Sequence, residues 1–143
     1  MDQNAPRVAG RLRSLAPEVR HIILARACNF SAARLGAVDA EVSELLNAIQ
    51  TNGKLSREQA DKAVSFAEAA GDRSFELEEQ CAPRQEWLKP LSEARLCTAI
   101  AMAFGPDSHD DSGAFYELLK SLDHGSGLES FIEAEISAAE TSR

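Results

Sequence analysis

The hydrophobic positions along the chain recur with the spacing of α-helices. Between Pro17 and Leu35, apolar residues follow one another at intervals of three and four, which predicts a long central helix. A second apolar face runs from Val42 to Ile49, after Asp39, a residue suited to cap a helix. No stretch alternates convincingly with the period of two that strands require.

Further helices are indicated by capping residues. Ser56 and Gln59 form the pattern of a capping box, and we expect the helix that they open to end at Gly71 and Asp72. Ser92 is expected to cap the next helix, which carries Leu96, Cys97, Ile100, Ala101 and Phe104. Two more apolar faces follow, the first made of Phe115, Leu118, Leu119 and Leu122 and the second of Leu128, Phe131, Ile132 and Ile136.

The pattern therefore predicts an all-α protein, a single compact bundle of six or seven helices spanning residues 1–143. It leaves open whether residues 1–16 are flexible. It also leaves open whether residues 72–90 form an irregular connection or a short helix. If the segment is an irregular connection, Trp87, which lies between two prolines, is expected to be its one buried anchor.

Composition supports a helical core and a reducing environment. The chain is 44% hydrophobic but only 6% aromatic, so alanine and leucine must supply much of the core, as closely packed helices allow. Three cysteines without a CxxC pair indicate neither a disulfide framework nor a zinc site. No secretory leader or membrane span is evident, because the most hydrophobic stretch, HIILARACNF, is short and is interrupted by Arg26. We expect a cytoplasmic protein.

The net charge of −8 is distributed unevenly along the chain. Residues 1–34 carry six arginines against two acids, a net +4, whereas residues 35–143 carry nine basic and 21 acidic residues, a net −12. The last stretch, 105–143, holds nine acids against two bases, a net −7. An acidic surface repels nucleic acid and favours a basic partner.

The densest polar cluster, PDSHDD, poses a choice between a metal site and a joint between helices. Neither register of the cluster provides the glycine and the glutamate that a calcium-binding loop needs, and His109 alone is too little for zinc. Gly105-Pro106 instead stops one helix, and Asp110, Asp111 or Ser112 can cap the next. We therefore expect no metal here and no other cofactor.

The remaining chemistry-bearing residues do not form a catalytic pattern. The histidines, His21, His109 and His124, are far apart, and Cys28 and Cys97 fall on apolar faces. The N-terminal arginines lack the aromatic neighbours typical of nucleic-acid sites. We expect Arg13, Arg20 and Arg34 to pair with the chain's own carboxylates or to form a solvated face. No catalytic residue and no nucleic-acid partner is predicted.

A contact surface for a basic protein partner is the site that the sequence favours, since complementary charge speeds encounter and aromatic anchors hold the complex. The alternative is an ordinary solvated rim. The predicted surface combines acidic residues with aromatic ones: Phe75, Glu76, Glu78, Glu79, Asp107, Asp110, Asp111 and Tyr116.

The stretch RLRSLAPEVRHIILARACNFSAARL, followed by an acidic middle and SEARLCTAIAMAFG, resembles a family of small all-helical bacterial proteins of uncharacterised function. Related helical proteins occur as immunity proteins beside secreted toxins. The resemblance implies stoichiometric binding, with an acidic face that plugs or distorts a cognate toxin, often a basic nuclease.

Two alternatives from other classes remain open. The first is a small-molecule binder or enzyme with a pocket between helices, lined by Trp87, Cys97, Met102 and Phe104. The second is a structural or oligomeric helical module, which would expose an apolar patch of several hundred Å².

Overall fold

The computed structural model describes residues 5–36, 38–106, 110–121 and 127–141, and within these ranges the chain forms helices and no strand. The all-α prediction is confirmed. The helices are α1 (Ala5–Arg13), α2 (Pro17–Leu35), α3 (Ala40–Asn52), α4 (Arg57–Glu79), α5 (Arg84–Phe104), α6 (Asp111–Ser121) and α7 (Leu128–Thr141).

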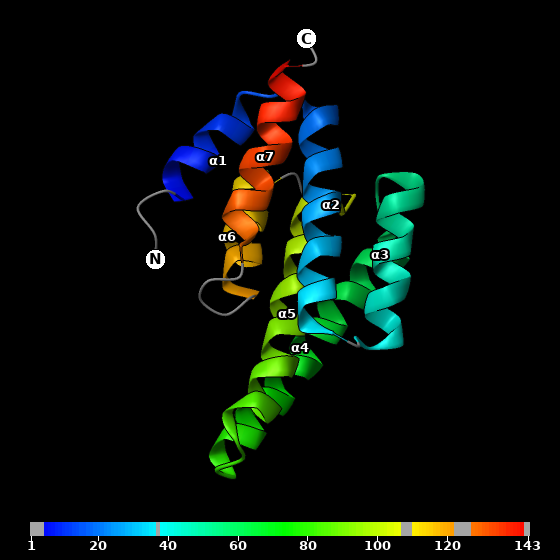
Figure 1. Ribbon diagram of the computed structural model, residues 1–143. Helices are drawn as coiled ribbons and strands as arrows, with labels where there is room; N and C mark the ends of the chain where they lie inside the picture. The colour runs from blue at the N-terminus through cyan, green and yellow to red at the C-terminus, as the bar shows by residue number, and fades with distance from the viewer. Residues whose placement is uncertain (1–4, 37, 107–109, 122–126, 142–143) are drawn as a thin grey trace.

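Helices α2 and α5 occupy the middle of the bundle, where α5 contacts α2, α3, α4 and α6, and α2 contacts α3, α5, α6 and α7. Helices α1, α6 and α7 lie on one side of this pair and α3 on the other (Figure 1). Helices α4 and α5 form a long antiparallel hairpin whose end projects below the rest of the molecule (Figure 1).

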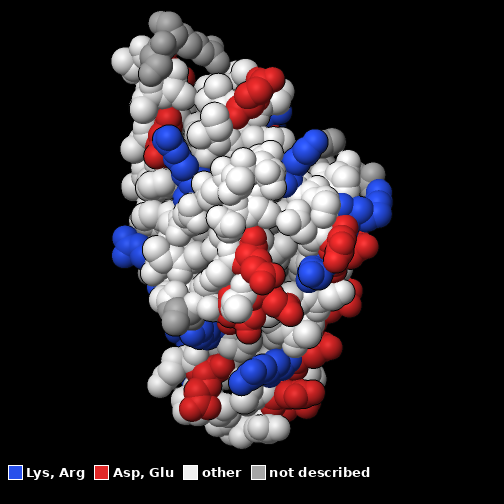
Figure 2. Space-filling model, turned by 90° about the vertical axis from the view of Figure 1, so that its right-hand side faces the viewer, with Lys and Arg blue, Asp and Glu red and all other residues white. Residues whose placement is uncertain are grey.

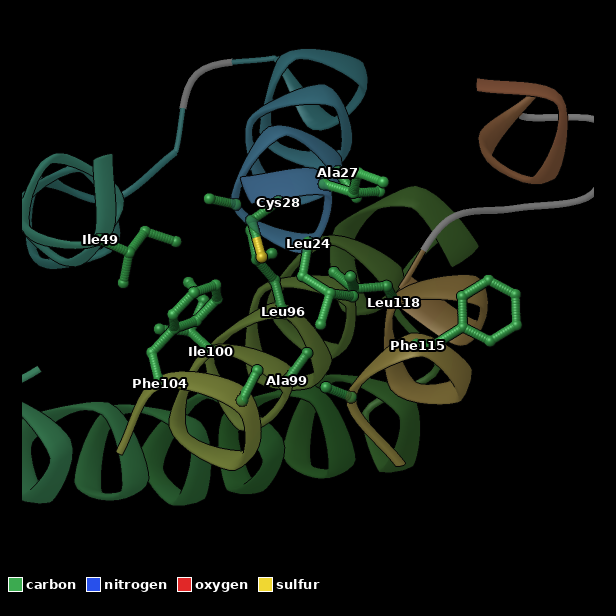
Figure 3. Packing of buried hydrophobic residues seen from close by; sticks show 14 of the residues in the cluster. Leu24, Ala27, Cys28, Ile49, Leu96, Ala99, Ile100, Phe104, Phe115 and Leu118 are labelled. Atoms are coloured by element: carbon green, nitrogen blue, oxygen red, sulfur yellow. The ribbon is translucent and has the colours of Figure 1, made fainter. Parts of the chain in front are cut away.

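The core is built around the contact of α2 with α5. Leu24 and Cys28 of α2 point toward Leu96 and Ile100 of α5, with Ile49 of α3 to one side (Figure 3). All of these side chains are buried, and one cluster of buried hydrophobic residues draws members from all seven helices. Alanine is common in it, which lets helices approach closely and compensates for the low aromatic content.

The N-terminal segment forms a helix from Ala5 to Arg13. Val8 and Leu12 of α1 are buried, and so is Leu15 beyond it. The apolar spacing of this helix was masked in the sequence by the arginines that alternate with it. Those arginines lie on the outer side of α1, so the helix is amphipathic.

Residues 72–90 differ from both sequence-based readings. Helix α4 continues through Gly71 to Glu79, and α5 begins at Arg84 with Pro90 inside it. Proline removes one backbone donor and usually kinks or ends a helix. Here the two helices support each other, and the Ser74 hydroxyl of α4 donates to the Trp87 carbonyl of α5 at 2.7 Å. Packing between α4 and α5 therefore outweighs the helix-breaking tendency of Gly71 and Pro90.

Two residues in or next to this segment also differ from the prediction. Trp87 is half-buried rather than a buried anchor, and Ser92 lies buried inside α5 rather than capping it. Two other predicted caps are confirmed. Asp39 caps α3 by accepting from the backbone N–H of Glu41, and Ser56 with Gln59 forms a reciprocal capping box at the start of α4.

Candidate partner-binding surface

The N-terminal arginines are largely used inside the molecule. Helix α1 packs against α7, and Arg11 of α1 contacts Glu140 at 2.5 Å while Arg7 contacts Glu133 at 3.0 Å. Helix α2 adds a third pair with α7, between Arg26 and Glu135 at 2.8 Å. The positive N-terminal helices thus neutralise much of the negative C-terminal helix.

Asp111, predicted to belong to the partner surface, instead lies between α2 and α6. Its two carboxylate oxygens contact Arg20 Nε at 2.9 Å and His21 Nε2 at 3.2 Å. The same guanidinium donates to the carbonyls of Arg13 and Leu15 at 3.1 and 3.2 Å. The Asp111 side chain is only 10% exposed, so this carboxylate holds α1, α2 and α6 together and offers little surface for contact.

Asp110 is exposed and caps α6. One of its carboxylate oxygens accepts the backbone N–H of Gly113 at 2.9 Å. A β-carbon at Gly113 would collide with this carboxylate and with the Met102 side chain, which explains the glycine. Tyr116 is half-buried, with its ring edge-on to Phe115. The predicted joint between helices is therefore present at Asp110 and Asp111, while Asp107 and His109 lie outside the described residues.

The other predicted group sits at the end of α4. Phe75, Glu76, Glu78 and Glu79 are exposed, and Phe75 is 60% accessible despite its apolar ring. Helix α5 separates this hairpin end from Asp110. With 21 residues, that helix is about 30 Å long. The two predicted groups therefore lie at opposite ends of α5 (Figure 1) and do not form one surface.

A more continuous acidic region was missed by the sequence analysis. Residues 39–79, which span α3 and α4, carry ten acidic and four basic residues, a net charge of −6. Whichever way these charges pair with one another, at least six of the ten acids have no basic partner within the segment. Figure 2 shows acidic side chains gathered over the middle of the face where α3 lies, and again near its lower end, where basic side chains lie between them.

A groove of about 720 Å³ lies between α3 and α4 in this region. Leu45 and Phe66 contribute apolar surface to it, the first buried and the second half-buried. Its exposed acidic lining residues are Glu41 and Glu44 of α3 and Glu58 and Asp61 of α4. Each pair is spaced by three residues, a signal that could have been noticed in the sequence. The two pairs line one groove because α3 crosses α4 beside them, and this crossing is not visible in the sequence.

The inter-helical pocket expected from Trp87, Cys97, Met102 and Phe104 is not formed by those residues. Cys97 and Phe104 are buried in the core. Burial, together with the nearby carboxylate of Glu93, raises the pKa of Cys97 to about 12, and burial likewise raises the pKa of Cys28. Met102 instead borders a separate apolar depression between α4 and α5, beside Val64 and Ala67.

Neither a metal-binding cluster nor a membrane-spanning helix occurs in residues 5–36, 38–106, 110–121 and 127–141. These residues contain no group of three histidine, cysteine, aspartate or glutamate side chains arranged to hold a metal ion. Among the seven helices, none combines the length and hydrophobicity needed to cross a bilayer.

Comparison of the chain with protein-family models, with curated proteins and with solved structures yields no match. The resemblance to toxin-immunity proteins stays a prediction.

Proposed function

We propose that this is a non-catalytic binding protein of the cytoplasm that neutralises a basic toxin by forming a one-to-one complex, in the manner of an immunity protein. The acidic side formed by α3 and α4 is the surface that we assign to the toxin. The class is the one predicted from the sequence, while the contact surface shifts from the start of α6 and the end of α4 to the side formed by α3 and α4.

The observation that carries the proposal is the location of the uncompensated charge. Four of the six arginines of α1 and α2, namely Arg7, Arg11, Arg20 and Arg26, face carboxylates of α6 and α7, so that side offers little net charge to a partner. The negative excess stays on α3 and α4. A field concentrated on one face raises the association rate of an oppositely charged protein and orients it before contact.

Apolar side chains within the acidic side give such a partner something to bury. Phe66 lies in the groove, and Phe75 is exposed at the hairpin end. Binding energy at protein interfaces comes mainly from a few well-packed anchors of this type, whereas surrounding charges set rate and specificity. An acidic rim around an apolar centre therefore suits a stable complex better than a uniformly charged surface.

The test starts with tagged protein used as bait in lysate of the source organism, eluted with a salt gradient and identified by mass spectrometry. The expected product is one basic protein whose expression alone slows growth and whose toxicity is relieved by co-expression of this chain. Calorimetry with the purified pair should give a one-to-one stoichiometry and an affinity that falls as salt rises. Recovery of the bait alone, or of a partner whose toxicity is unaffected, would contradict the proposal.

A further inference from the structure

We infer that the groove between α3 and α4 receives a single basic segment of the partner, with one apolar side chain seated against Leu45 and Phe66. This inference rests on the proposed function and specifies which part of the acidic side makes the contact. It excludes the hairpin end, with Phe75 and its three glutamates, as the primary site.

The walls of the groove place carboxylates on both sides of the occupant. Glu41 and Glu44 lie three residues apart on α3, and Glu58 and Asp61 have the same spacing on α4. Residues three apart project from the same face of a helix. A cationic side chain on either flank of the segment would therefore meet a carboxylate. Lys62 reaches Glu58 at only 3.8 Å with both side chains exposed, a weak pair that a partner can replace.

The apolar lining of the groove requires the occupant to carry an apolar side chain as well as basic ones. Leu45 is buried, while Phe66 is half-buried and lines the groove with Ala69. The volume of about 720 Å³ lies within the range of roughly 300–1,000 Å³ that holds compact ligands. It accommodates a segment of chain and not a whole domain. One apolar side chain at its centre would cover the remaining surface of Phe66.

The charge of the lining selects a basic occupant. The groove is lined by four carboxylates against Arg57 and Lys62, so it retains a negative excess. A neutral or acidic segment would take these carboxylates out of water without supplying compensating charge, which is costly. The occupant is therefore a stretch in which lysine or arginine flanks apolar residues.

The probe is a fluorescein-labelled peptide of alternating lysine and leucine, titrated with the full chain and followed by anisotropy. Two companion peptides replace leucine by alanine or lysine by glutamate. We expect saturable one-site binding of the lysine–leucine peptide that weakens with salt, weaker binding of the lysine–alanine peptide, and none of the glutamate–leucine peptide. Absence of saturable binding by the lysine–leucine peptide overturns the inference.

Two charge-matched variants locate the site. Glu41→Lys, Glu44→Lys and Asp61→Lys together should weaken peptide binding by at least about tenfold, whereas Glu76→Lys, Glu78→Lys and Glu79→Lys together should change it by about twofold or less. Both sets change net charge equally and alter exposed side chains. If the hairpin variant loses binding and the groove variant keeps it, the groove is excluded while binding of a basic partner stands.

The role of Phe66 as the apolar contact for the peptide is tested separately with Phe66→Ala. This variant should lose affinity for the lysine–leucine peptide and keep its weaker affinity for the lysine–alanine peptide, because only the former contacts the ring. Circular dichroism checks that each variant is folded, and Phe66→Leu keeps the test valid if the alanine variant unfolds. Equal losses for both peptides would contradict the anchor. Failure to recover a basic toxin, in contrast, would refute the proposed function whatever the peptides do.

Discussion

The two sides of the bundle use their charges in different ways. On the side of α1, α6 and α7, arginines of the first two helices meet carboxylates of the last two, as in the pair between Arg26 and Glu135 at 2.8 Å. On the side of α3 and α4, residues 39–79 carry ten acids and only four bases. The first arrangement joins distant parts of the chain, and the second leaves a field directed outward.

This difference shows why charge summed along the sequence misleads about the surface. Residues 105–143 have a net charge of −7 and were expected to supply half of an acidic contact surface. Folding brings Asp111 against Arg20, and Glu133 and Glu140 against arginines of α1. The segment with the smaller excess, 39–79 at −6, contributes the acidic groove because α5, which packs along α4, carries three bases against two acids and so adds a net charge of only +1.

The largest change in stability is expected from a cavity in the core that both sides share. Ile100 of α5 is completely buried, and Ile100→Ala should lower the free energy of unfolding by about 2–5 kcal/mol through the cavity that it leaves. Urea denaturation followed by circular dichroism measures this change. Ile22→Ala is the matched control, since Ile22 is 55% exposed, and it should stay within about 0.5 kcal/mol of the unmodified protein. Similar losses in both variants would contradict the placement of α5.

A smaller difference in folding stability is expected between removing a paired acid and removing an unpaired one. Asp111→Ala leaves Arg20 and His21 without their shared carboxylate and should cost about 1–3 kcal/mol of folding stability. Asp61→Ala, which removes an exposed acid from the groove, should change stability by no more than about 0.5 kcal/mol. Thermal melts of the two variants side by side make the comparison. Equal destabilisation would show that the two sides do not differ as described.

The smallest effect tests whether α4 is continuous. Gly71 lies inside this helix with open space where a β-carbon would stand, so Gly71→Ala should raise stability by about 0.5–1 kcal/mol. Gly53 also has open space but a φ of +72°, and Gly53→Ala should instead lower stability by about 1–2 kcal/mol. Urea midpoints compare the two. A loss at Gly71 would indicate that the helix ends there, as the sequence suggested.

Local signals predicted the elements whose ends depend on nearby residues. The caps at Asp39 and at Ser56 with Gln59 were found because a side chain needs only its own backbone neighbours to cap a helix. The same reasoning failed at Gly71 and Pro90, where locally unfavourable residues lie within helices that pack along each other. The Ser74 hydroxyl bonded to the Trp87 carbonyl is one such non-local contribution, invisible to any local pattern.

The sequence by itself determined that the chain is all-helical, that its core is rich in alanine and leucine, and that it carries an acidic excess. These properties follow from side-chain volume, periodicity and charge, which need no knowledge of distant contacts. Only the tertiary structure decided which acids remain available. Ion pairs depend on which helices face one another, so Asp111 became part of the folded framework while Glu41 and Asp61, far apart in the chain, came to line one groove.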